Sequence, residues 1–356
     1  MMSPSTIVTL TLNPALDVST AVPRIEPAHK LRCEPPRYDP GGGGINVARV
    51  IRRLGGSALA VYPEGGSTGQ RLSYLLKAEG TPTRAVRIAG ETRESFTVLD
   101  QAAVAEYRFV LPGPRLSAAE LGACVDTAIG ATSPPGFVVV SGSLPPGAGP
   151  DCLADLAGRA RTAGLRLAVD TSGPALAAAL EAGVYLAKPN LRELSELTGT
   201  PLPDTAARVR ACRDLIARGG TSAIALSLGA EGALLVTADA AWSSPGLPVE
   251  PVSSVGAGDS FLGGFLQALG GGLGLVEGFR RAMAAGTAAL LSPGTELCRP
   301  ADVARLLDQV SVIPVEGPGR ERATASPASA PGPAATRPAP ARTAGRARGA
   351  PEDHPG

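Results

Sequence analysis

A chain of 356 residues with 44% hydrophobic and 18% charged residues is long enough for one large α/β domain, or two smaller ones, with a sizeable core. Its formal net charge of +1 gives no reason to expect nucleic acid or an anionic membrane surface as a partner. The chain has two histidines, His29 and His354, so a Ser-His-Asp triad or a histidine-based metal centre is nearly excluded.

The cysteines and the beginning of the chain point to the same compartment. Five cysteines are scattered without a C-x-x-C pair, which is typical of reduced thiols rather than of a disulfide framework or a zinc site. The N-terminus has no basic region of a signal peptide, and no apolar run is long and unbroken enough for a membrane span. The sequence therefore predicts a cytoplasmic protein without a membrane partner.

The first predicted element is a buried strand at Ile7–Leu12, a β-branched and apolar run that ends at Asn13-Pro14. Asp17 follows just past the carboxyl end of this strand, where open α/β sheets collect ligands. Residues 18–40 contain several prolines around two short alternating runs. We expect a peripheral hairpin there rather than part of the core.

Four glycines, Gly41–Gly44, precede a helix whose predicted apolar face ends at Leu54. They do not make the dinucleotide-binding pattern G-x-G-x-x-G/A, because no starting position satisfies it; counted from Gly41, the sixth residue is Asn46. The glycines therefore predict backbone that can approach a ligand closely, with Asn46 as a polar contact on the first helical turn.

A second hairpin is predicted further along the chain. After a strand at 58–62 and a helix at 69–79, strands at 94–99 and 106–110 flank a short loop. Arg93 and Arg108 lie at corresponding points on this hairpin. Two arginines on a hairpin usually form solvated surface; if the hairpin covers a pocket, their guanidinium groups would suit a phosphate.

From Leu116 onwards, helices and strands alternate. We expect helices at 117–130, 150–163, 275–291 and 301–309, and strands at 137–140, 165–170, 184–187, 223–228 and 233–237. Such alternation indicates right-handed βαβ units and a parallel sheet with helices on both faces. Asn190 and Glu193 lie one turn apart at a helix start, where they would form a capping box, with or without a further role.

The stretch Val255–Ser260, with the sequence V-G-A-G-D-S, stands directly before an apolar run that is compatible with a helix. Small residues at a helix start leave backbone N–H groups bare, and these donors and the helix dipole make an anion site. Asp259 stands beside that site as a potential general base. The alternative is an ordinary helix start, since Gly and Asp are common there. A P-loop is absent, so phosphoryl transfer would need a different solution.

The composition changes after Val315. Residues 316–356 are almost wholly Pro, Ala, Gly, Ser, Thr and Arg without apolar periodicity, which predicts a disordered tail behind a single domain at 1–315.

Several motifs together resemble a known family. They are Gly41–Ala48, Val140–Gly147, Lys188–Asn190, Ser227–Gly232 and Val255–Ser260. On these motifs the chain resembles the ribokinase-like (PfkB) sugar kinases over nearly all of residues 6–310. The resemblance implies an α/β three-layer sandwich with a mostly parallel central sheet. It also implies a small β-strand lid within 18–40 and 93–110, which commonly pairs with a second subunit, so a homodimer is expected.

Within this family the chain is most similar to the ATP-dependent 6-phosphofructokinase branch. The shared segments are Lys30–Cys33, Pro40–Asn46, Leu54–Ala58, Glu106–Val110 and Gly294-Thr295. The 1-phosphofructokinase and tagatose-6-phosphate kinase branches typically carry a lysine within the glycine loop, and they remain the alternatives. A non-catalytic sugar-phosphate-binding protein is a more remote one.

The resemblance also implies roles for individual residues. Asp259 would deprotonate the C1 hydroxyl of fructose 6-phosphate, and the backbone of Gly256, Ala257 and Gly258 would form the anion hole. Asp17, Gly42, Gly43 and Asn46 would hold the sugar hydroxyls. Arg93, Arg108, Ser143 and Lys30 would hold the 6-phosphate. Lys188, Asn190, Glu193, Ser227 and Gly229 would bind ATP.

The same resemblance implies two metal ions. Mg²⁺ would lie near Asn190 and Glu193, bound through water. A K⁺ ion would lie near Ser253, Val255, Ala289, Ser292 and Gly294. Dependence on K⁺ stays open. The chain has Ser292 and Glu296 at positions where members of the 6-phosphofructokinase branch that it resembles carry Asn and Arg.

Overall fold

The large sheet carries the core of the protein, whose computed structural model describes residues 7–294 and 296–315. Its strands are β1 (Ile7–Leu10), β4 (Ala58–Glu64), β5 (Thr83–Arg87), β8 (Phe137–Ser141), β9 (Arg166–Asp170), β10 (Leu186–Ala187), β11 (Ala223–Ser227), β12 (Gly232–Thr237), β13 (Ala241–Pro245) and β14 (Ile313–Pro314). They lie in the order β14-β13-β12-β11-β10-β9-β8-β1-β4-β5. Pairing is parallel from β5 to β11 and antiparallel from β11 to β14.

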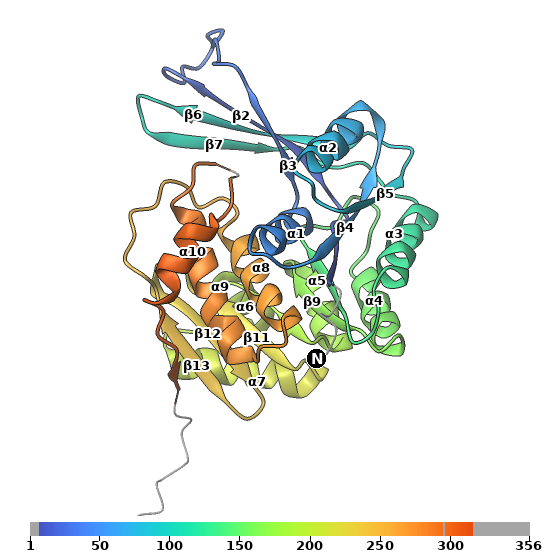
Figure 1. Cartoon of the computed structure of the whole chain (residues 1–356), viewed down its shortest axis with the longest axis vertical. Coiled ribbons are helices and arrows are strands. Elements are labelled where there is room, and N and C mark those ends of the chain that lie inside the picture. The colour runs from blue at the N-terminus through green and yellow to red at the C-terminus, as the bar shows by residue number, and fades with distance from the viewer. Residues whose placement is uncertain (1–6, 295, 316–356) are drawn as a thin grey trace, which may run out of the picture. The chain divides into compact units, whose positions relative to one another are not determined.

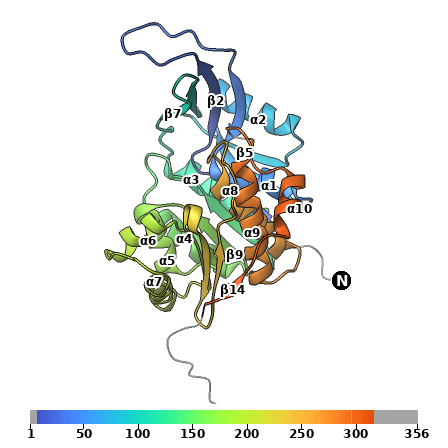
Figure 2. The same cartoon turned by 90° about the vertical axis from the view of Figure 1, so that its left-hand side faces the viewer.

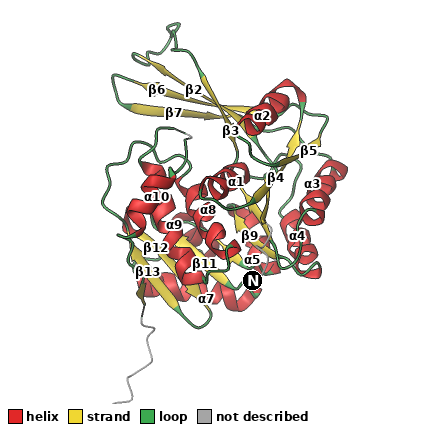
Figure 3. Ribbon diagram, in the orientation of Figure 1, coloured by secondary structure: helices red, strands yellow, loops and turns green. Residues whose placement is uncertain are grey.

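Helices cover both faces of this sheet, as Figure 3 shows. One face packs on α1 (Gly43–Arg53), α2 (Gly66–Ala78), α8 (Ala257–Gly270), α9 (Leu275–Leu290) and α10 (Pro300–Leu307). The other packs on α3 (Ala118–Gly130), α4 (Asp151–Thr162), α5 (Gly173–Ala182), α6 (Leu191–Thr198) and α7 (Thr205–Gly219). A 3₁₀ turn, η1 (Gly229–Glu231), joins β11 to β12.

Alternation along the central strands divides the core into two halves. On β8, Phe137 and Val139 join the cluster under α1, α8 and α9, whereas Val138 and Val140 join the cluster under α3 to α7. All four side chains are at most 1% exposed, as expected for a strand that is covered on both faces. The predicted three-layer α/β architecture is confirmed.

A second, four-stranded sheet stands apart from these layers in Figures 1 and 2. It contains β2 (Ala15–Val22), β3 (Arg37–Gly41), β6 (Arg93–Asp100) and β7 (Ala105–Val110), in the order β3-β2-β6-β7. The central pair, β2 and β6, is parallel, and the two outer pairs are antiparallel. The two predicted hairpins therefore associate into one small sheet, which we call the lid.

The structure differs from the sequence prediction in several places. The first strand ends at Leu10 instead of Leu12, and Asp17 lies inside β2 rather than in a loop. The reason is that residues 15–22 pair with β6 about 80 residues later, a long-range contact that local patterning does not show. Helices α5 and α7 and strands β5, β13 and β14 have no predicted counterpart. Strand β5 lies at the sheet edge without a buried residue, so it carries no apolar alternation.

Two further expectations concern the tail and membrane spans. The predicted disordered tail at 316–356 lies outside the described residues. Within 7–294 and 296–315, none of the helices combines the length and apolar composition that crossing a membrane would require.

Candidate active site

Helix α8 begins with backbone donors that its own turns cannot use. Gly256, the N-cap, has a φ of 75°, a left-handed conformation that glycine adopts without steric cost. The N–H of Ala257 donates to the Ser254 carbonyl at 3.4 Å. Across the described ranges, no acceptor is recorded for the N–H groups of Gly256, Gly258 and Asp259. These donors, together with the positive end of the helix dipole, can hold an anion.

Asp259 lies on the first turn of α8, beside these donors. Its Oδ2 accepts a hydrogen bond of 2.9 Å from Nδ2 of Asn46, which comes from the first turn of α1. Burial and the nearby carboxylate of Asp170 raise the pKa of Asp259 to about 6, against the lowering effects of Asn46, Lys188 and Ser141. A carboxylate with this pKa is ionised at neutral pH and well suited to accept a proton.

Lys188 follows β10 and lies against the same helix start. Its Nζ is 3.0 Å from Oδ1 of Asp170, at the end of β9. A Cβ placed on Gly258 would lie only 3.3 Å from this Nζ, so the ammonium adjoins the anion site directly. Burial alone would lower the pKa of Lys188, but the carboxylates of Asp170, Asp259 and Glu193 outweigh it and raise this pKa. Lys188 is therefore a cation at neutral pH in the site.

The glycine loop lies against the ends of β1 and β8. Gly42 has a φ of 111°, and a Cβ on it would lie 2.7 Å from Cγ2 of Thr11. A Cβ on Gly43 would overlap the Ser141 hydroxyl, and a Cβ on Gly41 would overlap the Asp17 carboxylate. Larger residues cannot occupy these positions without displacing site groups. The backbone of this loop therefore lies close to protein groups of the site, and its approach to a ligand stays a prediction.

The lid brings Asp17 close to two arginines. Burial raises the pKa of the Asp17 carboxyl to about 6, although Arg108 and Arg93 both lower it. Arg93 is fixed by donation from its Nη2 to the Asn13 carbonyl at 3.0 Å and from its Nη1 to the Leu111 carbonyl at 3.1 Å. The two guanidinium groups and the carboxylate therefore share one face of the lid.

Asn13 connects this face to the loop after β8. Its Nδ2 donates to the Ser143 hydroxyl at 3.0 Å, and its buried Oδ1 has no hydrogen-bond partner among the described residues. Strands β1 and β8 are neighbours at the point where the strand order reverses direction, which is where open α/β sheets bind ligands. Lys30, in contrast, lies on the exposed loop between β2 and β3, and no contact joins it to the other predicted site residues in the described structure.

Asn190 and Glu193 form the predicted capping box of α6. The N–H of Glu193 donates to Asn190 Oδ1, and the N–H of Asn190 donates to Glu193 Oε2, both at 2.9 Å. Ser227 pairs with Asn190 through a parallel bridge, and Gly229 follows with a φ of 62°. No cluster of three or more metal-binding side chains exists within the described ranges. The second carboxylate oxygen of Glu193 suits Mg²⁺ held mainly by phosphates and water.

Backbone hydrogen bonds join the two segments that contain the residues predicted to hold K⁺. The N–H groups of Val252 and Ser253 donate to the Leu290 carbonyl at 2.7 and 3.4 Å. The Ser292 hydroxyl is buried, and no hydrogen-bond partner for it is found in the described part of the chain. Such an unused oxygen fits a cation that takes oxygen ligands.

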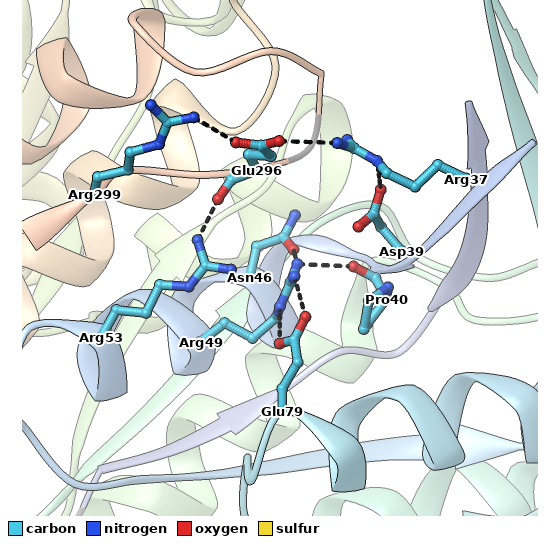
Figure 4. Close-up of polar contacts among 9 residues, drawn as sticks. All are labelled: Arg37, Asp39, Pro40, Asn46, Arg49, Arg53, Glu79, Glu296 and Arg299. Atoms are coloured by element: carbon cyan, nitrogen blue, oxygen red, sulfur yellow. Dashed lines mark hydrogen bonds and ion pairs between the residues drawn. The ribbon is translucent and has the colours of Figure 1, made fainter. Parts of the chain in front are cut away.

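Glu296 stands at the position where the resemblance implies Arg in related kinases. In this protein it is surrounded by arginine side chains. Its carboxylate accepts from Arg37 of the lid at 3.1 Å and from Arg299 at 2.8 Å, and Arg53 donates to its backbone carbonyl (Figure 4).

Two site residues were not predicted from sequence, namely Asp170 and Asn13. Asp170 ends a predicted strand and Asn13 follows one, so position at a carboxyl end was the available signal. Their partners depend on which strands are neighbours.

Comparison with known proteins gives a consistent result. The sequence model of the pfkB family carbohydrate kinases matches residues 11–302. The chain is 45% identical to an ATP-dependent 6-phosphofructokinase isozyme 2 of Mycobacterium tuberculosis over 302 residues, which cover 85% of this chain and 89% of that protein. It is 38% identical to a 1-phosphofructokinase of Haloferax volcanii over 275 residues, or 77% and 87% of the two chains.

Solved structures agree. Phosphofructokinase-2 of Escherichia coli in complex with potassium matches with a TM-score of 0.83 at 40% identity, covering 86% of this chain and 99% of that one. The same protein in complex with fructose-6-phosphate matches with a TM-score of 0.81 at 39% identity, with the same coverage. A tetrameric inhibited form of it is also known. Ribokinase of Arabidopsis thaliana, 20% identical over 86% of this chain and 99% of that one, shares the fold with a TM-score of 0.67.

Proposed function

Because the chain belongs to the pfkB family of carbohydrate kinases, and is therefore a phosphotransferase, we propose that it is an ATP-dependent 6-phosphofructokinase. It would transfer the γ-phosphoryl group of ATP to the C1 hydroxyl of fructose 6-phosphate and form fructose 1,6-bisphosphate. The observation that carries the chemistry is the Asp259 carboxylate beside the bare N–H groups of α8. The choice of substrate is supported by the names of the relatives at 45% identity and of the matching solved complex.

In this proposal, Asp259 takes the proton of the C1 hydroxyl as the oxygen attacks the γ-phosphorus. The bond from this phosphorus to the β,γ-bridging oxygen breaks, and ADP leaves with the electron pair. The N–H groups of Gly256 and Gly258, and that of Ala257 after it leaves Ser254, donate to the oxygens of the transferring group. The Lys188 ammonium adds positive charge at the same place. Stabilisation of the developing charge by fixed donors is the main contribution that proteins make to phosphoryl transfer.

The sugar phosphate would lie between the lid and the glycine loop. Asp17 and Asn46 hold hydroxyl groups, and the backbone of Gly42 and Gly43 lines the sugar. Arg93, Arg108 and Ser143 bind the 6-phosphate, because a guanidinium matches the geometry of phosphate oxygens. Lys30, on the exposed loop at 23–36, is the fourth residue that we assign to this phosphate.

The nucleotide would lie over α6 and η1, along Asn190, Glu193, Ser227 and Gly229. Mg²⁺ bound there would neutralise charge on the ATP phosphates. Glu193 would orient water molecules around it through the carboxylate oxygen that takes no part in the capping box. A K⁺ ion at the Ser292 hydroxyl and the carbonyl groups near Ser253 would stabilise the loop that positions the start of α8.

We propose further that the protein forms a homodimer through the lid. Strand β7 exposes large apolar side chains, with Phe109 53% and Val110 63% exposed. Exposed apolar surface of this kind on a sheet edge typically marks an interaction site.

A substrate panel at saturating ATP tests the proposed activity. The expected result is the highest kcat/KM with fructose 6-phosphate, compared with fructose 1-phosphate and tagatose 6-phosphate. A higher value with either competitor would replace the substrate assignment, which the 1-phosphofructokinase relatives keep as the alternative. Asp259→Ala should lower kcat by about 10²–10⁴-fold, the usual range for a general base, while sugar phosphate still binds. Normal turnover in this variant would show that Asp259 is not the general base. If the wild-type protein phosphorylated none of the sugar phosphates, a non-catalytic binding protein would be favoured.

A further inference from the structure

Arg49 is a buried cation that lies outside all the substrate contacts proposed above. It is on α1 and only 2% exposed. Its Nε and Nη2 donate to the two carboxylate oxygens of Glu79 at 2.7 and 2.6 Å, a bidentate pair. Its Nη1 donates to the Pro40 carbonyl at 3.1 Å and to Asn46 Oδ1 at 3.2 Å (Figure 4). A fully buried charge of this kind persists only when it is paired and hydrogen-bonded.

The contact with Asn46 determines how the amide of that residue is turned. Asn46 Oδ1 accepts from Arg49, and Asn46 Nδ2 donates to Asp259 Oδ2 at 2.9 Å. Rotation of the amide by half a turn would place its NH₂ group against the guanidinium and its oxygen against the carboxylate. Both contacts would then be repulsive, because a guanidinium only donates and a carboxylate only accepts. Arg49 therefore selects the orientation in which Asn46 donates to Asp259.

We propose that Arg49, held by Glu79, is a positioning residue for phosphoryl transfer, which fixes the Asn46 amide so that it orients Asp259. The relay runs from Glu79 at the end of α2, through Arg49 and Asn46 on α1, to Asp259 on α8. It rests on the proposed role of Asp259 as the base. The bond from Arg49 to the Pro40 carbonyl also ties the end of lid strand β3 to the same relay.

The relay affects the pKa of Asp259 as well as the orientation of its carboxylate. Asp170 and Lys188 are the charged groups that face Asp259 from the sheet, and Ser141 is a neutral donor there. Asn46 is the donor from α1. A hydrogen bond donated to a carboxylate favours its ionised form, so loss of this bond raises the pKa of Asp259.

The test uses purified full-length protein with ATP and fructose 6-phosphate. We expect Arg49→Met to lower kcat by about 10–100-fold, the effect of a small misplacement of a reacting group. The acidic limb of kcat/KM against pH should move up by about half a pH unit, the effect of one lost hydrogen bond. Arg49→Lys should have a kcat and an acidic limb between those of the wild type and Arg49→Met. The reason is that an ammonium cannot donate to Glu79, Pro40 and Asn46 together.

Arg52→Met is the matched control, because Arg52 lies on the same helix, is exposed and has no side-chain partner within the described residues. It should leave kcat and the acidic limb unchanged. If Arg49→Met lost activity only in proportion to a lower melting temperature, with the acidic limb unmoved, Arg49 would be merely structural and the proposal would be wrong.

A second variant decides the question if Arg49→Met does not fold. Glu79 is 34% exposed at its side chain, so Glu79→Gln keeps the shape of a partly solvated group. It should move the acidic limb in the same direction by a smaller amount, and an unshifted limb in folded Glu79→Gln overturns the relay. Asp259→Asn separates the two proposals. Normal activity of Asp259→Asn would show that Asp259 is not the general base. If Asp259→Asn is inactive while Arg49→Met has normal activity, Asp259 keeps its role and only the proposed relay is wrong.

Discussion

The ammonium of Lys188 lies 3.0 Å from Oδ1 of Asp170 and beside the backbone of Gly258, so one ion pair joins the ends of two neighbouring parallel strands to the start of α8. The pair places its positive member against the anion site and its negative member near Asp259. Asp170 and Lys188 therefore influence the base in opposite directions: the carboxylate raises the pKa of Asp259, and the ammonium lowers it.

Replacing Lys188 and replacing Asp170 should therefore shift the acidic limb of the pH profile in opposite directions. Lys188→Met should move the acidic limb of kcat/KM to higher pH, and Asp170→Asn should move it to lower pH. Lys188→Met should also lower kcat by about 10²-fold, because it removes a cation from the place where charge develops. Lys77→Met, an exposed lysine on α2, is the control and should change neither quantity. Shifts in the same direction would show that the pair does not act on Asp259 electrostatically.

The raised pKa of Asp259 has a consequence for stability. Its pKa is about 6 in the folded protein and 3.8 in the unfolded reference, so between these values the folded state binds the extra proton. The contribution of this carboxyl therefore destabilises the fold fully above pH 6 and fades as pH falls toward 4. Asp259→Asn should raise the free energy of unfolding in urea at pH 7.5 by about 1–2 kcal/mol, a figure reduced for partial solvent screening.

The pH dependence of this gain separates it from a general effect of the substitution. At pH 4.5 most of the gain should have disappeared. Asp308→Asn, which changes an exposed carboxylate at the end of α10, should show no comparable pH-dependent gain. A gain in Asp259→Asn that is equal at both pH values would contradict the burial of a charged carboxylate as its cause.

The parts of the site that were predictable from sequence depend on the backbone or on side chains that are close in the chain, such as the capping box of Asn190 and Glu193. Gly42 and Gly256 have φ values of 111° and 75°. The small residues around them in the sequence predict backbone that other groups can approach closely. The parts that were not predictable are pairs of side chains from strands that are adjacent only in the sheet. Asp170 meets Lys188 because β9 and β10 are parallel neighbours, and Asn13 meets Ser143 because β1 lies beside β8.

The lid is a second case in which long-range strand pairing could not be predicted from the sequence. Both hairpins could be predicted from local alternation, but the parallel pairing of β2 with β6 that joins them could not. This pairing extends β2 back to Ala15 and moves Asp17 from a supposed loop into a strand, where the arginines of the second hairpin reach it.

The unused hydroxyl of Ser292 predicts a dependence on monovalent cations. We expect K⁺ to increase kcat compared with tetramethylammonium at equal ionic strength, and Ser292→Ala to raise the K⁺ concentration needed for half-activation. Ser244→Ala is the matched control, because the Ser244 hydroxyl on β13 is also buried and without a partner in the described residues. Equal K⁺ dependence in the wild type and Ser292→Ala would exclude this hydroxyl as a ligand.

The exposed side chains of β7 predict that the lid mediates assembly. Along this strand, Tyr107 and Phe109 share one face, and Arg108 points to the other, the face of Asp17. Phe109→Glu places a charge on the apolar face and should convert a dimer into monomers in sedimentation velocity experiments, because an unpaired charge is costly to bury in an interface. The KM for the sugar phosphate should rise as well, since Arg108 lies on the same strand. Tyr74→Glu, a change at a 70% exposed aromatic residue on α2, controls for the loss of any surface ring. A dimer that persists in Phe109→Glu would place the subunit interface elsewhere.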